Sequence, residues 1–139
     1  MVFIRPIAGK KLLGSAGRHT LVTDRKTSDG GTDMGFTSGE LLLLAVASCA
    51  TGSIRKTLTQ QAIPADDIAV EVDLVPPKDA TDRDGILITV FVDQSVLAAS
   101  AASIIAAATS GGVVSRVQLG SEIEVRCRPL AESPISPIS

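Results

Sequence analysis

The spacing of apolar and polar residues along the chain predicts five strands and two helices. Short segments rich in β-branched residues and bounded by turn residues are typical of strands. They cover residues 2–7, 18–24, 68–75, 85–93 and 122–128. Two longer apolar segments predict helices, one over residues 38–61 and one from about 95 to 108. Because the strands are grouped before and after helices, the pattern indicates an α+β chain rather than repeated βαβ units.

Turn and capping residues define the ends of both helices. Ser38 is expected to cap the first helix, and Pro64 follows its end. Gln94 or Ser95 is expected to cap the second helix, which the glycine pair at 111–112 should end. The sequence therefore predicts two helices with defined ends.

The predicted strands also suggest how they pair. The glycines of residues 14–17 predict a turn region between the first two strands. The strands over 68–75 and 85–93 should pair antiparallel across the loop between them. Strict alternation in the last strand places three side chains on its inner face, namely Ile123, Val125 and Cys127. We expect antiparallel sheets.

Both predicted helices lack a polar face. Residues 41–47 contain no polar side chain, and residues 96–108 offer only Ser to water. One small sheet cannot cover two such helices, so we expect a homodimer in which the helices of two chains pack together. The sheets would then close over two buried central helices.

Length and composition narrow the classes of function. The 139 residues suit one domain, expected over 1–130, with a flexible tail over 131–139 where Pro and Ser recur. Formal net charge is only -2 and the chain has no Trp or Tyr, which argues against nucleic-acid binding. The uncharged stretch 95–115 is rich in Ala and Ser and contains Gly, so we expect no membrane span. Because two cysteines are too few for a disulfide scaffold, a reducing cytoplasm is the default expectation for its location.

Cysteine is the one residue type that offers chemistry. The chain has two cysteines and a single His, so neither a disulfide framework nor a metal or other cofactor is expected. On a helix, Cys49 shares its face with Ala45, Val46, Gly52 and Ser53. The thiol is thus surrounded by small residues, which leaves room for a partner helix or for a small apolar substrate. Two interpretations stand at this point, a reactive thiol or a small core residue.

The residues that lead into Cys49 resemble a family signature. Gly30-Gly31 and the later segment GFTSGELLLLAVASC, which spans residues 35–49, are similar to the GG...GxSPxELLLxALxxC pattern of OsmC-like proteins. The order of strands and helices along most of the chain is similar as well. The resemblance implies an OsmC-like fold, an intertwined homodimer with the cysteine helices at its centre, and possible reduction of organic hydroperoxides. In that chemistry a thiolate attacks the peroxide and becomes a sulfenic acid, which a second cysteine resolves to a disulfide.

When the family pattern is compared with this sequence residue by residue, Cys49 matches the attacking cysteine, but no cysteine matches the resolving one. The family's second cysteine lies in a CPVSRxL-like segment after the second helix. Here Gly112-Val113-Val114-Ser115-Arg116 occupies that place, with Gly112 at the cysteine position. Cys127 is interpreted as a core residue of the last strand rather than a displaced resolving thiol.

Two charged residues are candidates to activate the thiol. The resemblance implies a Glu just before the cysteine helix and an Arg from the N-terminal strands. Glu40 is the candidate Glu, although it falls one residue after the family position, which is Gly39. The nine residues from 40 to 49 turn an α-helix through about 900°, which would place Glu40 on the side opposite Cys49. It also suits a first-turn carboxylate that stabilises the helix dipole. Arg18 is the candidate Arg, and an exposed strand residue is the alternative.

Two functions remain open. The first is a thiol peroxidase that works through Cys49, with Arg18 and Glu40 as candidate activating residues and an external dithiol as reductant. The second is a redox-inactive OsmC-like dimer that binds a small apolar ligand or has another role.

Overall fold

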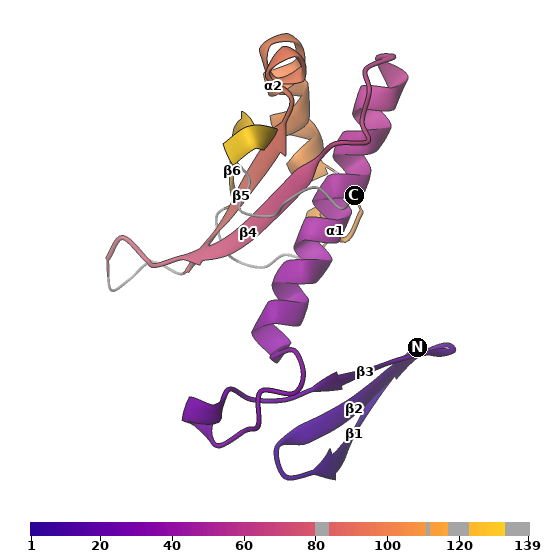
Figure 1. Cartoon of the computed structure of the whole chain (residues 1–139), viewed down its shortest axis with the longest axis vertical. Coiled ribbons are helices and arrows are strands. Elements are labelled where there is room, and N and C mark those ends of the chain that lie inside the picture. The colour runs from indigo at the N-terminus through magenta and orange to yellow at the C-terminus, as the bar shows by residue number, and fades with distance from the viewer. Residues whose placement is uncertain (80–83, 111, 117–122, 133–139) are drawn as a thin grey trace. The chain divides into compact units, whose positions relative to one another are not determined.

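The computed structural model describes residues 1–79, 84–110, 112–116 and 123–132, and the chain divides into two compact units, Met1–Leu43 and Leu44–Ser139. In the first unit lie β1 (Val2–Ala8), β2 (Lys11–Ala16), β3 (His19–Thr23) and the start of α1 (Ser38–Gln60). The second unit holds the rest of α1, followed in order by β4 (Ala69–Val75), β5 (Gly85–Val92), α2 (Gln94–Ser110), α3 (Gly112–Arg116) and β6 (Ile123–Pro129) (Figure 1). The α+β prediction is confirmed. One domain over residues 1–130 stays a prediction, and each unit is described in turn.

The first unit is built on a three-stranded antiparallel sheet in the order β1-β2-β3. The turn predicted over residues 14–17 is wrong for its first three residues, which belong to β2. Gly14 pairs with Ile4 on one side and Leu21 on the other. A methyl group added at Gly14 would lie 3.6 Å from Leu21 Cδ1, in ordinary van der Waals contact with that side chain. The tight turn starts only at Gly17, with φ of 59°.

The second unit holds a three-stranded sheet in the order β4-β5-β6. β4 and β5 pair antiparallel, as predicted. β6 pairs parallel with β5, so the expectation of purely antiparallel sheets is wrong for the last strand. The physical reason is the crossover: α2 carries the chain back along the sheet, and β6 therefore starts at the same end as β5. One βαβ unit is thus embedded in the α+β fold.

The core of the second unit lies around β5, which is the central strand. Buried side chains of β5 pack with one stripe of each long helix, and α1 contributes Val46, Ala50, Ile54 and Leu58 at four-residue spacing. Val125 and Cys127 pack against this core, as the alternation of the last strand predicts. The side chain of Ile123 lies outside the described residues. The core therefore supports α1 along one face.

The helices are not buried all round within one chain, and their burial by a second chain stays a prediction. Leu44 on α1 is 49% exposed and Ile105 on α2 is 42% exposed, because the chain supplies packing partners for only one face of each helix. By length and composition alone α1 could cross a membrane, a property that it shares with core helices of soluble proteins. The homodimer stays a prediction.

Asp93 rather than Gln94 or Ser95 caps α2. Its carboxylate accepts hydrogen bonds from the Ser95 amide at 2.8 Å and the Ser95 hydroxyl at 2.5 Å, and its carbonyl accepts from the Leu97 amide. At the other end of the chain, residues 131–132 belong to a short 3-10 helix, Leu130–Glu132, and the remainder of the predicted tail lies outside the described residues.

Candidate functional site

Cys49 lies on α1, beside the stripe of that helix that packs into the core. It is half-buried and packs against the core cluster without being enclosed by it. Its neighbour Ala50 is completely buried, whereas Ser48 on its other side is exposed. The thiol therefore lies at the border between the packed face of the helix and its uncovered face.

Gly112 lies next to Cys49 in the structure. A methyl group added at Gly112 would lie 3.6 Å from the Cys49 Sγ and 3.9 Å from its Cβ. Gly112 has φ of 61°, a left-handed conformation that glycine adopts without strain, and it is exposed. The fold thus brings together the cysteine and the position where the family resemblance places a second cysteine.

Cys127 is a free thiol with a different environment. It is half-buried on β6, packs against the core, and has its pKa raised by burial. A raised pKa leaves little thiolate at neutral pH, and the thiolate is the nucleophilic form. These contacts agree with the interpretation of Cys127 as a packing residue.

Glu40 is engaged at the N-terminus of α1. Its carboxylate accepts a hydrogen bond from the Thr37 amide at 2.7 Å, while its own amide donates to Thr37 Oγ1 at 3.2 Å. Thr37 and Glu40 thus form a capping box, so the expected cap, Ser38, is wrong by one residue. Lys26 Nζ lies 2.9 Å from Glu40 Oε1. The Thr37 amide, and then Lys26, lower the Glu40 pKa from 4.5 to about 2.

Arg18 lies in the turn between β2 and β3. It is exposed and follows Gly17, and β3 begins only at His19, so the expectation that Arg18 belongs to a strand is wrong. A tight turn at Gly17 explains the difference, because the left-handed glycine reverses the chain there. Arg18 and Glu40 belong to the unit Met1–Leu43, and Cys49 to Leu44–Ser139. Their roles at the thiol stay predictions.

A buried carboxylate organises the loop that leads into α1. Asp24 is only 3% exposed and accepts hydrogen bonds from the Thr32 hydroxyl at 2.6 Å and from three backbone amides, those of Arg25, Thr32 and Met34. Led by the Thr32 hydroxyl, these bonds hold the pKa of Asp24 well below its usual range. Sequence reasoning missed this residue, because a lone Asp at a strand end shows nothing of its distant partners.

The glycines of the same loop are required by close backbone contacts. Gly30 adopts φ of 76°, and a side chain on Gly31 would collide with the backbone of Arg25. A side chain on Gly35 would collide with the Val22 carbonyl. Gly30-Gly31 therefore forms a turn before the cysteine helix.

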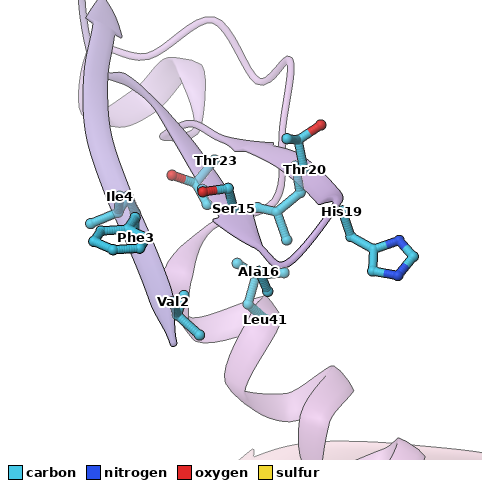
Figure 2. A pocket seen from close by; sticks show the side chains of 11 residues that line it. Val2, Phe3, Ile4, Ser15, Ala16, His19, Thr20, Thr23 and Leu41 are labelled. Atoms are coloured by element: carbon cyan, nitrogen blue, oxygen red, sulfur yellow. The ribbon is translucent and has the colours of Figure 1, made fainter.

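An apolar pocket of about 190 Å³ opens on the first unit. Figure 2 shows Val2 and Ile4 of β1, Ala16 of β2 and Leu41 of α1 around it. Neither Cys49 nor Gly112 lines it, and the surface is almost entirely apolar. The pocket therefore offers mainly hydrophobic contact, and no cysteine lines it. Among the described residues, no three metal-ligating side chains come together.

Comparison with known proteins supports the family resemblance. A family model described as "OsmC-like protein" matches residues 30–128, which include Gly30-Gly31, Cys49, Gly112 and Cys127. No protein with a curated description matches the chain.

Solved structures share the fold at low sequence identity. An organic hydroperoxide resistance protein from Elizabethkingia anophelis with bound thiocyanate has a TM-score of 0.70 at 8% identity, covering 92% of this chain and 94% of that one. The organic hydroperoxide resistance protein OhrB of Bacillus subtilis has a TM-score of 0.64 at 17% identity, with coverages of 92% and 96%. The Legionella pneumophila organic hydroperoxide resistance protein OsmC scores 0.63 at 12% identity, with coverages of 92% and 95%. Because the family model covers most of the sequence and the fold agrees, the chain belongs to the OsmC-like protein family.

Proposed function

We propose that this protein is a thiol peroxidase that reduces organic hydroperoxides through Cys49 and is returned to the thiol by an external reductant. The observation that carries the proposal is the position of Cys49 in the matched family region, half-buried and beside an exposed glycine. Similarity to proteins named for organic hydroperoxide resistance supports this choice of substrate class.

The reaction needs little from the protein beyond a reactive thiolate and a place for the substrate. The thiolate attacks one peroxide oxygen, the O–O bond breaks, and the alcohol leaves with a proton. A hydroperoxide and a thiol are thereby converted into an alcohol and a sulfenic acid on Cys49. The small residues around Cys49 on α1 favour access by an apolar substrate, and Ala45, Gly52 and Ser53 leave room beside the sulfur.

Glu40 and Arg18 are proposed as the charged residues that activate the Cys49 thiol. Glu40 is anionic at neutral pH, and its Thr37 and Lys26 contacts stabilise the start of the helix that carries Cys49. Arg18 is exposed, and its guanidinium is a positive charge on the surface of the first unit.

A homodimer in the cytoplasm is part of the proposal. The uncovered apolar side chains of the helices, such as Leu44 and Ile105, favour a second chain as their packing partner.

The test is peroxide consumption by the wild type, Cys49→Ser and Cys127→Ser, with cumene hydroperoxide as substrate and added dithiothreitol as reductant. We expect activity in the wild type and in Cys127→Ser, and background consumption in Cys49→Ser, because only Cys49 is proposed to form the sulfenic acid. Equal background rates in all three proteins would refute the peroxidase proposal. Loss of activity in Cys127→Ser alone would move the chemistry to the other thiol.

A second candidate function is binding of a small apolar ligand without redox chemistry. The observation that favours it is the apolar pocket of the first unit. Its volume of about 190 Å³ is below the range of roughly 300–1,000 Å³ for drug-sized ligands, so only a small molecule would fit. A fluorescent apolar probe that binds equally to the wild type and Cys49→Ser, in a protein without peroxidase activity, would favour this function.

A further inference from the structure

The N-terminal hairpin, residues 1–16, exposes apolar side chains along the whole of its first strand. β1 forms one edge of its sheet, and all seven of its residues are exposed. Val2, Phe3 and Ile4 are 75%, 64% and 61% exposed, respectively. The apolar pocket extends this surface, because the same three side chains line it (Figure 2). A continuous apolar surface of this kind is typical of an interaction site.

The exposed apolar side chains lie on both faces of β1. Side chains alternate along a strand, so Val2 and Ile4 project to one face while Phe3 and Arg5 project to the other. A second copy of the chain that packed on one face would leave the other face uncovered. A lipid surface can surround both faces of an edge strand at once.

The same part of the chain carries positive charge without a neighbouring carboxylate. Residues 1–23 contain no Asp or Glu but four cations, namely Arg5, Lys10, Lys11 and Arg18. Among the described residues, none of these four takes part in an ion pair. Lys10 is exposed in the turn between β1 and β2. The hairpin therefore presents uncompensated positive charge beside its apolar strand.

Three of the four acidic residues of the first unit are engaged elsewhere. Asp24 is buried within its loop, and Asp33 and Glu40 share Lys26 at 3.3 and 2.9 Å. The first unit contains six cationic residues, although the whole chain has a net charge of -2. Such a difference in charge between two parts of one chain indicates an anionic partner for the positive part.

We propose that the N-terminal hairpin docks on the surface of a membrane that contains anionic phospholipid. The apolar side chains of β1 enter the headgroup region, and the cations of the hairpin lie against lipid phosphates. Proteins bind membrane surfaces in this way by combining buried apolar area with attraction to anionic lipid. Contact between two copies, hairpin to hairpin, would instead bring like charges together. The inference goes beyond the proposed peroxidase function and does not depend on it.

The experiment measures co-sedimentation of the full chain with lipid vesicles. One set of vesicles contains phosphatidylcholine alone, and the other contains phosphatidylcholine with phosphatidylglycerol. We expect binding to the anionic vesicles only, and weaker binding at high salt, because ions screen the attraction. Lys10→Glu should weaken binding by about fivefold or more, since each cation near an anionic lipid surface contributes an attraction of that size.

Matched controls separate the hairpin from the rest of the chain. Lys56→Glu makes the same charge change at an exposed position of α1 in the second unit. Ile7→Ser tests the apolar contribution, and Leu74→Ser is its control, because these strand residues are 46% and 48% exposed. We expect weaker binding in Lys10→Glu and Ile7→Ser but not in the two controls. Circular dichroism checks that all four variants are folded.

Three results would overturn the proposal. Absence of wild-type binding to phosphatidylglycerol vesicles would refute it, as would equal losses in Lys10→Glu and Lys56→Glu. A dimer that Ile7→Ser converts to monomer in analytical ultracentrifugation, without any vesicle binding, would assign the hairpin to a second copy of the chain. Peroxide consumption is measured without vesicles, so failure of the peroxidase proposal is seen separately.

Discussion

Single residues in the loop before α1 hold the backbone in place and have no proposed part in the reaction. Asp24 ties its loop together with hydrogen bonds to Thr32 and Met34, and Gly35 passes so close to Val22 that a side chain cannot be accommodated. Such roles cannot be read from the sequence, because the partners are distant along the chain and only the folded backbone brings them together.

Replacement of Gly35 by Ala should destabilise the protein. The new Cβ would collide with the Val22 carbonyl, which belongs to β3 and cannot shift without disturbing the strand. We expect the free energy of unfolding to fall by about 2 kcal/mol or more, as for other strained or overpacked sites. Urea denaturation of Gly35→Ala measures this loss.

Gly39→Ala is the matched control for that substitution. A methyl group at Gly39 meets no atom within 4 Å, and the residue lies in the first turn of α1. Because Ala favours a helix over Gly by up to about 1 kcal/mol, this variant should be neutral or slightly more stable. Equal losses in both variants would contradict the structural reason given for Gly35.

At the scale of elements, the sequence predicts most helices and strands but mistakes their ends and one of their directions. The first helix begins at Ser38 as expected, yet Thr37 supplies the cap, because the reciprocal bond from Glu40 reaches back three residues. β2 was missed because Gly14 and its small neighbours resemble a turn, and only the pairing with Leu21 shows why they form a strand. The parallel direction of β6 depends on where α2 delivers the chain, which local pattern does not encode.

The charge of Glu40 should stabilise the start of α1 in a pH-dependent way. Its pKa is lowered from 4.5 to about 2 in the folded protein, so its contribution is fully present above pH 4.5 and is lost as the pH falls towards 2. Glu40→Gln removes the charge but retains an acceptor for the Thr37 amide. We therefore expect Glu40→Gln to be less stable than the wild type at pH 7, with the difference shrinking as the pH falls from about 4.5 to 2.

Urea denaturation at a series of pH values measures this dependence. Asp66→Asn is the control, because Asp66 is an exposed carboxylate 3.7 Å from Arg55, and such surface pairs contribute little. A Glu40→Gln difference that stayed constant down to pH 2 would show that the charge is not the cause.

At the scale of the whole molecule, some apolar side chains of the helices have no packing partner within one chain. Leu44 is 49% exposed and Ile105 is 42% exposed in one chain. α2 carries no charged side chain, and α1 carries none between residues 41 and 54. Such surface is typical of an interface with another chain.

Leu44→Glu should therefore disrupt a dimer without unfolding the chain. The substitution places a charge on the uncovered face of α1, where Leu44 is 49% exposed. Gln60→Glu is the control, since Gln60 is exposed on the same helix and gains the same charge. We expect a shift to monomer for Leu44→Glu alone, with an unchanged circular dichroism spectrum, and analytical ultracentrifugation checks the mass. A wild-type monomer, or an unchanged dimer in Leu44→Glu, would refute this interface.

The sequence by itself determined the α+β class, the antiparallel β4–β5 pair, the extent of the cysteine helix and, through its resemblance, the family. These features are local, because hydrophobic period and helix breakers act within a few residues. The tertiary structure alone decided that Gly112 lies against Cys49, that Thr37 and Lys26 engage Glu40, and that β6 is parallel to β5. Each of these depends on packing between segments distant in the sequence, and such contacts form only when the whole chain has folded.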